Sequence, residues 1–332
     1  MTDGYANSDI LIISACRTPI GRFCGSLAGI PTHELGGTVI SECIKRVSFI
    51  LFYMSYISGS SNFEPFSDQY VLKASKQFAD QTEEDVLSQI SEVIMGLSYT
   101  VPAWGLNMLC ASGMKAVCQC FQTLRLEGGM AVAGGQESMS RCPHITPPGC
   151  SLRRGGGGGN ADGLPVFGDF RLVDSLLNDG LEDAFHGIHM GVTAENIAQK
   201  FQIGRIDQDA FAYESQVRCK HAVELGKFKS EIVPVSITKT DKRGVPNEPV
   251  IISLDEPPRP QTTMEALAKL RPAFANGLPQ PQDATVTAGN ASGLADGAAA
   301  LLLCRADTAK NLGMLPYPDI MPVLFQLNLK SA

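Results

Sequence analysis

Residues 104–135 read WGLNMLCASGMKAVCQCFQTLRLEGGMAVAGG, and they contain the clearest secondary-structure signals of the chain. Residues 112–124 place apolar side chains at helical spacing, and residues 129–135 form a short run of small apolar residues. The first pattern predicts a helix, and the second predicts a buried strand directly after it. A helix joined to a buried strand is the repeating unit of α/β proteins.

The same alternation continues outward along the chain. Short apolar runs predict further strands, and helical spacing predicts further helices, whereas residues 47–71 show no clear period. The strands are expected at residues 9–15, 91–96 and 297–304, the helices at 34–45, 207–228 and 307–312, and a hairpin at 231–238 and 250–254. We therefore predict an α/β layered fold, with a mixed, mostly parallel sheet and helices on both faces.

The composition excludes several classes of protein. With 332 residues, 44% of them hydrophobic, the chain can bury a full core, so it is not a disordered protein. Its net charge of −7 argues against a nucleic-acid-binding protein, which needs a basic surface. The ten cysteines include no C-x-x-C pair and do not cluster with the five histidines, so no metal site is predicted.

Neither a membrane span nor a targeting segment is expected. The longest apolar run, residues 47–57, is too short to cross a bilayer, which takes roughly 20 residues. Residues 1–8 have neither the apolar region of a signal peptide nor the basic amphipathic character of a mitochondrial transit peptide. We therefore expect a cytoplasmic rather than a mitochondrial protein, with no membrane partner.

Cys110 is the strongest candidate for chemistry. It stands directly before Ala-Ser-Gly at the start of the predicted helix. The unpaired N–H groups at a helix N-terminus favour an anion such as a thiolate, and small neighbours let an acyl group approach. On the local sequence alone, two interpretations stay equally open: Cys110 is a nucleophile, or it is one more buried thiol.

Seven segments, in this order, match a known family. They are SACRTPIGRFCGSLAGIPTHELG (14–36), SEVIMG (91–96), VPAWGLNMLCASGMKAV (101–117), AVAGGQESMSRCPH (131–144), DSLLNDGLEDAFHGIHMGVTAENIA (174–198), RPQTTMEALAKLRPAF (259–274) and TVTAGNASGLADGAAALLL (285–303). The chain resembles the thiolases, most closely the acetyl-CoA acetyltransferases, which join two acetyl-CoA into acetoacetyl-CoA or split it. The resemblance implies an acyltransferase with the thiolase-like layered fold.

The resemblance also implies a domain organisation. Residues 1–140 and 283–314 correspond to the N-terminal α/β domain of thiolases, and residues 47–100 are atypical within it. Residues 141–282 correspond to the loop domain that binds CoA. Residues 315–332 would be the start of the C-terminal domain.

By the same resemblance, Cys110 takes up the acetyl group as a thioester, and CoA thioesters are substrates, so no metal and no other cofactor is implied. Eight further residues match positions that contact the substrate: Leu181, His189, Met190, Arg259, Phe274, Ala288, Ser292 and Gly293. His189 and Met190 would line the acyl and pantetheine pocket, and Arg259 would lie near the CoA phosphates. Without the resemblance, Met190 and Phe274 would also fit a core, and Arg259 a solvated charge.

The sequence departs from the family pattern at two places. The Asn-Glu-Ala-Phe, Gly-His-Pro and Cys-x-Gly-Gly-Gly segments of the second thiolase half do not occur, so a chain truncated in its C-terminal half is expected. That half carries the base that activates the nucleophile. A homo-oligomer, either a dimer or a tetramer, is implied, although residues 97–100 replace the helix that supports the family's dimer interface.

Three functions therefore remain open. The first is an acetyl-CoA C-acetyltransferase that works through Cys110. The second is a catalytically inert thiolase-like protein that binds acyl-CoA or a protein partner. The third is a longer-chain 3-ketoacyl-CoA thiolase.

Overall fold

The computed structural model describes residues 6–58, 101–145, 172–238 and 248–311. The chain forms two compact units, of which unit 1 comprises Met1–Ser138, Gly226–Glu256 and Ala295–Ala332, and unit 2 comprises Met139–Leu225 and Pro257–Leu294. Residues 226–256 thus group with unit 1, although they lie inside the predicted loop domain. Within the described ranges, no helix has the length and apolar character that a membrane span requires.

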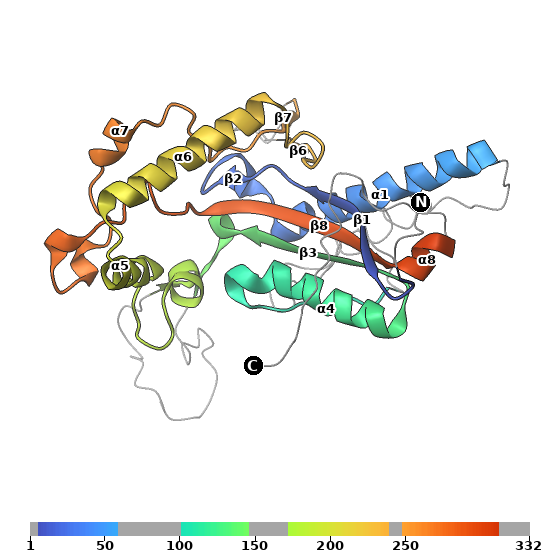
Figure 1. Ribbon diagram of the computed structural model, residues 1–332, viewed down its shortest axis with the longest axis horizontal. Helices are drawn as coiled ribbons and strands as arrows, with labels where there is room; N and C mark the ends of the chain where they lie inside the picture. Colours follow the sequence, from blue (N-terminus) through green and yellow to red (C-terminus); the bar gives the residue numbers. More distant parts are fainter. Residues whose placement is uncertain (1–5, 59–100, 146–171, 239–247, 312–332) are drawn as a thin grey trace, which may run out of the picture. The chain divides into compact units, whose positions relative to one another are not determined.

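A four-stranded sheet forms the centre of unit 1 (Figure 1). Strand β8 (Ala295–Arg305) pairs with β3 (Met130–Ser138) along one edge, and with β1 (Ile10–Arg17) and β2 (Gly21–Arg22) along the other. All three pairings are antiparallel.

The expectation of a mostly parallel sheet is therefore wrong for the described strands. β1 and β3 do run in the same direction, but they do not pair, because β8 returns from unit 2 in the opposite direction and lies between them. The expected strand at residues 91–96 lies outside the described residues.

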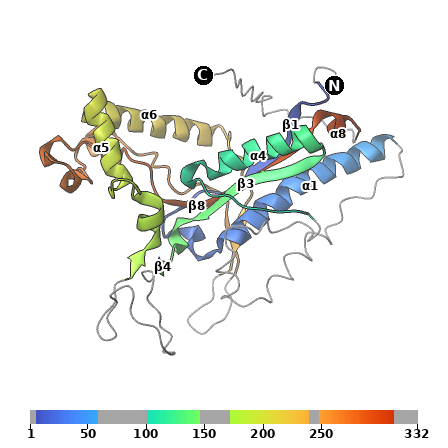
Figure 2. The same cartoon turned by 90° about the horizontal axis from the view of Figure 1, so that it is seen from below.

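Helices cover both faces of this sheet, as expected (Figure 2). Alternate side chains of β8 point to opposite faces. Ala300, Leu302 and Cys304 pack with α1 (Thr32–Ser58), whereas Leu303 packs with Leu124 of α4 (Ser112–Glu127). A strand buried on both faces explains the continuous apolar run at residues 297–304.

Helix α1 is longer than the sequence predicts. The expected helix ended at residue 45, because the apolar period is lost after residue 47, yet α1 continues to Ser58. Neither proline nor glycine occurs from residue 38 to residue 58, so nothing in this stretch of the sequence interrupts the backbone hydrogen bonds.

Helix α5 (Met190–Phe201) was not predicted from the sequence, whereas the other remaining elements agree with predicted ones or are short. Unit 1 also contains the antiparallel pair β6 (Val235–Ile237) and β7 (Val250–Ile252), the turn η1 (Ser26–Gly29) and helix α8 (Ala306–Asn311). Unit 2 contains β4 (His144–Ile145), β5 (Val173–Asp174), α5 (Met190–Phe201), α6 (Arg205–Glu224), α7 (Met264–Ala268) and the turns η3 (Met139–Arg141), η4 (Leu176–Leu181), η5 (Ala275–Gly277) and η6 (Pro281–Asp283).

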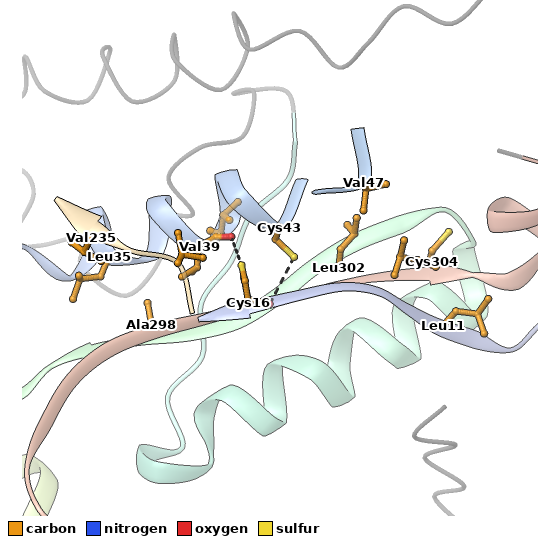
Figure 3. Close-up of a cluster of buried hydrophobic side chains, with 14 of the residues drawn as sticks. Leu11, Cys16, Leu35, Val39, Cys43, Val47, Val235, Ala298, Leu302 and Cys304 are labelled. Atoms are coloured by element: carbon orange, nitrogen blue, oxygen red, sulfur yellow. Dashed lines mark hydrogen bonds between the residues drawn. The ribbon is translucent and has the colours of Figure 1, made fainter. Parts of the chain in front are cut away.

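Two cysteines meet in the core between the sheet and α1 (Figure 3). Cys16 Sγ donates a hydrogen bond to the carbonyl of Val39 at 3.1 Å, and Cys43 Sγ lies 3.8 Å from the carbonyl of Ala300. Since Ala300 is the strand partner of Cys16, both thiols occupy the same level of the core. The hydrogen bond with Cys43, together with burial, raises the pKa of Cys16. Both residues therefore act as packing residues rather than as exposed nucleophiles.

Substituting Gly134 in β3 should destabilise the sheet. A Cβ atom at this position would lie 2.1 Å from the carbonyl oxygen of Ala299, which is backbone and cannot move aside. We expect Gly134→Ala to lower the free energy of unfolding by about 1–3 kcal/mol, the usual cost of overpacking, in urea denaturation. Gly135→Ala is the matched control, because its Cβ would lie 3.5 Å from the nearest atom, at Gly113. Equal effects of the two variants would contradict this packing.

Because of Cys304, the free energy of unfolding should fall as the pH rises above about 9. Burial, with a smaller contribution from Asp307, raises the pKa of this thiol from 9.0 to about 11. Below pH 9 the Cys304 thiol is protonated in both the folded and the unfolded chain, so the chain keeps its full stability. As the pH rises from 9 to 11, the unfolded chain loses this proton before the folded chain does. The free energy of unfolding then falls with a slope of at most about 1.4 kcal/mol per pH unit.

The measurement is urea denaturation at pH 8 and at pH 10.5, for the wild-type chain and Cys304→Ala. The stability difference between the two proteins should shrink at the higher pH, because only the wild-type chain must keep the buried Cys304 thiol protonated, while the other buried thiols are common to both proteins. A difference that stays constant with pH would contradict the prediction.

Candidate functional site

Cys110 lies at the surface of unit 1, where the short turn η2 (Leu109–Ala111) leads into α4. It is exposed, and Cys24 is the only other exposed cysteine among those that the structure describes. The interpretation of Cys110 as one more buried thiol therefore does not hold. A thiol at this point is open to a reactant from solution.

The backbone around Cys110 has an uncommon conformation that side chains on both sides stabilise. Leu109 has a φ of 52°, in the left-handed region that residues other than glycine rarely adopt. Its N–H donates to Asn107 Oδ1 at 2.8 Å, and its carbonyl accepts from Ser112 Oγ at 2.7 Å. Ser112 Oγ also accepts from the N–H of Met108 at 2.8 Å.

Asn107 and Ser112 thus hold the turn that presents Cys110. Sequence reasoning assigned them no role, although short polar side chains that bond to nearby backbone are a recognised sign of such turns.

In unit 2, the expected substrate residue His189 is the N-cap residue of α5, and its ring contacts two other residues. Its Nδ1 accepts a hydrogen bond from the N–H of Gly191 at 2.9 Å. Its ring stacks on the ring of Phe274, with the centroids 4.8 Å apart and the planes at 25°. Two residues that the sequence places far apart are therefore in direct contact.

Leu181 and Met190 belong to the same part of unit 2. Leu181 ends the turn η4, and the next residue, Glu182, forms an antiparallel bridge with His189. Met190 follows His189 as the first residue of α5 and is exposed. The structure thus brings together Leu181, His189, Met190 and Phe274, four of the eight expected substrate residues.

Three more expected substrate residues, Ala288, Ser292 and Gly293, directly follow residues 285–286, which hydrogen bonds to Glu195 hold in place. Glu195 is 3% exposed, and its carboxylate accepts hydrogen bonds from the N–H groups of Thr285 and Val286 and from Thr285 Oγ1, at 2.8–3.0 Å. Pro272 pairs with Thr287, and the N–H of Ala273 donates to the carbonyl of Val286 at 2.9 Å. Phe274 is therefore positioned by the same segment.

A second polar residue, Asn290, fixes the loop beyond this segment. Its Oδ1 accepts from the N–H of Thr287 at 2.7 Å, and its Nδ2 donates to Asp209 Oδ1 at 2.9 Å. Asp209 is buried and forms an ion pair with Arg205 at 2.7 Å. The loop exposes the expected residues Ala288, Ser292 and Gly293 at its surface. Sequence reasoning missed Glu195, Asp209 and Asn290, because their partners are distant in the chain.

Arg259 lies against a different element. Its backbone N–H donates to Gln216 Oε1 of α6 at 2.8 Å, and the residue is exposed. The structure thus ties Arg259 to α6 rather than to the N-terminus of α5, where His189 lies.

All eight expected substrate residues belong to unit 2, and Cys110 belongs to unit 1. Within the described ranges, no group of three or more His, Cys, Asp or Glu side chains could hold a metal ion.

Comparisons with known proteins agree on one family. The family described as "Thiolase, N-terminal domain" matches residues 10–307. The acetyl-CoA acetyltransferase of Pseudomonas aeruginosa is 40% identical over 319 residues, which cover 92% of this chain and 68% of the relative. The cytosolic acetyl-CoA acetyltransferase of Mus musculus is 38% identical over 318 residues, which cover 95% of this chain and 70% of the relative.

Solved structures give the same result. Human mitochondrial 3-ketoacyl-CoA thiolase in complex with CoA superposes with a TM-score of 0.67 at 29% identity, covering 92% of this chain and 67% of that structure.

Proposed function

Because this chain belongs to the thiolase family of acyltransferases, we propose that it acts as an acetyl-CoA C-acetyltransferase through an acetyl thioester on Cys110. The observation that carries the proposal is the exposed Cys110, which a hydrogen-bonded turn presents at the start of α4. Relatives that are 38–40% identical and bear the name acetyl-CoA acetyltransferase support this substrate over other acyl-CoA molecules.

The reaction has two halves. In the first, the Cys110 thiol gives up its proton and attacks the acetyl carbonyl of one acetyl-CoA, and CoA leaves with that proton, so that the acetyl group is bound as a thioester. In the second, another acetyl-CoA loses an α-proton, and its enolate attacks the thioester to form acetoacetyl-CoA. The Cys110 thiolate that is released takes up a proton, which balances the α-proton lost. The sum converts two acetyl-CoA into acetoacetyl-CoA and CoA, and the same steps run backwards when acetoacetyl-CoA is split.

The residues of unit 2 would bind the CoA thioester. His189, Met190 and Phe274 would contact the acyl group and the pantetheine arm, together with Leu181 and the loop that carries Ala288, Ser292 and Gly293. Arg259 would supply positive charge for the CoA phosphates, which matters because the chain as a whole has a net charge of −7. The binding of CoA by a structural relative supports this assignment. We further propose that the chain needs no metal or redox cofactor, is cytoplasmic and assembles with copies of itself.

A longer-chain 3-ketoacyl-CoA thiolase is the second candidate, because a human 3-ketoacyl-CoA thiolase shares the fold at 29% identity. The test is the cleavage of 3-ketoacyl-CoA substrates of increasing chain length by CoA, followed through acetyl-CoA formation. We expect kcat/KM to be highest for acetoacetyl-CoA and to fall as the chain lengthens. The opposite order would favour the second candidate. Binding of CoA without turnover of any substrate would instead identify an inert thiolase-like protein.

A further inference from the structure

Asp209 connects helix α6 to the loop of residues 287–293, which contains three of the expected substrate residues. The side chain of Asp209 is 3% exposed. Its Oδ2 accepts a hydrogen bond from Arg205 Nε at 2.7 Å, and its Oδ1 accepts one from Asn290 Nδ2 at 2.9 Å. A carboxylate this deeply buried needs partners for both oxygens, and here each oxygen has one.

The side-chain amide of Asn290 can adopt only one orientation. Its Oδ1 lies 2.7 Å from the N–H of Thr287, which can only donate. Its Nδ2 lies 2.9 Å from Asp209 Oδ1 and 3.1 Å from the carbonyl oxygen of Thr285, and both of these oxygens accept. A flipped amide would lose all three bonds, so the link between the loop and α6 is specific.

The loop is anchored at its first residue. Thr287 is fully buried, and its carbonyl accepts from the N–H groups of Asn290 and Ala291 at 3.3 Å and 3.0 Å. Its Oγ1 accepts from the N–H of Gly289 at 3.2 Å. Residues 291–293 are exposed. The buried start of the loop therefore determines how its later residues are presented at the surface.

Arg205 also holds the apolar side of the loop. Its Nη2 donates to the carbonyls of Leu267 and Leu270, at the end of α7 and just beyond it, at 2.6 Å and 3.1 Å. The side chains of these leucines lie against Gly289, where an added Cβ would come within 2.5 Å of Leu270 Cδ1 and 2.6 Å of Leu267 Cδ2. One guanidinium therefore fixes both the carboxylate that binds Asn290 and the leucines that pack on the loop.

We infer that Arg205 and Asp209 are positioning residues that raise the affinity for a CoA thioester, because they hold residues 287–293 in the conformation that receives it. A loosely held loop would have to become ordered when the ligand binds, and this ordering weakens binding. Since Cys110 belongs to unit 1, loss of these contacts should weaken binding without slowing the chemical step. The identity of the ligand rests on the proposed function, but the order of the loop does not.

The order of the loop can be measured without a ligand. Hydrogen exchange in the full chain, followed by mass spectrometry, reports on the amides of residues 287–293. Asp209→Asn keeps the size of the side chain but replaces one acceptor by an NH₂ group, so either Arg205 or Asn290 loses its bond. We expect this segment to exchange about 10-fold faster, the usual effect of one lost hydrogen bond. Unchanged exchange would overturn the inference.

The effect on the ligand is measured through the acetylation of Cys110 at increasing concentrations of acetyl-CoA. In Asp209→Asn the half-saturating concentration should rise about 10-fold, while the maximal rate stays within about twofold of the wild type. A purely structural role would lower the melting temperature and leave the half-saturating concentration unchanged, and that result would overturn the inference. Glu214→Gln is the matched control, because Glu214 pairs with Arg218 at the same spacing on α6 but is 52% exposed. It should change neither exchange nor affinity.

A second variant keeps the test decisive if Asp209→Asn does not fold. Asn290→Ala removes the loop's side of the same bond but keeps the ion pair of Asp209 with Arg205. It should also loosen the loop and weaken binding, and its effects should not add to those of Asp209→Asn in a folded double variant. Wild-type affinity in Asn290→Ala, or additive effects, would overturn the inference. A wild-type chain that acetyl-CoA does not acetylate would instead overturn the proposed function, and the exchange rates would still decide whether Asp209 holds the loop.

Discussion

Replacing Cys110 by serine is expected to abolish the transfer of an acetyl group from acetyl-CoA to the chain. A serine hydroxyl keeps the size and the place of the thiol, but it is far less acidic and is a weak nucleophile without an activating base. The rate of covalent acetylation should fall by about 10³-fold or more. Mass spectrometry of the peptide that contains residue 110, after incubation with acetyl-CoA, measures this first half of the reaction by itself.

Cys24 provides the matched control for this substitution. It is the other exposed cysteine among the described residues, and its own φ of 55° is left-handed, as is the φ of 52° at Leu109, directly before Cys110. Cys24→Ser should be acetylated at the wild-type rate. Persistence of acetylation in Cys110→Ser, or its loss in Cys24→Ser, would show that Cys110 is not the acyl acceptor.

Removing the carboxylate of Glu195 is expected to cause the largest loss of stability in unit 2. Its two oxygens satisfy two backbone N–H groups and one hydroxyl in a site where Glu195 is 3% exposed. Glu195→Ala would leave these donors buried without acceptors, so the free energy of unfolding should fall by about 3–5 kcal/mol. Chemical denaturation measures this change.

Two further variants show how much of the expected loss of stability comes from the hydrogen bonds of Glu195. One removes its charge but keeps one oxygen, and the other changes an exposed residue of the same helix. Glu195→Gln keeps one oxygen but turns an amide NH₂ towards the donors, so we expect a loss of about 2 kcal/mol. Asn196→Ala, at an exposed position of the same helix, should change stability by no more than about 0.5 kcal/mol. If Glu195→Ala were as stable as Asn196→Ala, Glu195 would not be what holds residues 285–287.

The local elements of this protein could be predicted from its sequence. Helix α4 and strands β3 and β8 occur where apolar spacing places them, because periodicity depends only on neighbouring residues. The position of Cys110 at the start of α4 follows for the same reason. The end of α1 was misjudged, because its last turns carry no clear apolar period while nothing in the sequence stops the helix.

The sequence was therefore sufficient to identify the family and to predict the helix and the strand that follow Cys110, and it made this cysteine the candidate nucleophile. The tertiary structure was needed to show that β8 lies antiparallel between β1 and β3, that Phe274 stacks on His189, and that Glu195 binds residues 285–286. These contacts join residues that are distant in the chain. A sequence pattern reports how a segment faces the core, but not which remote segment meets it there, because packing and hydrogen bonding select the partner only when the whole chain has folded.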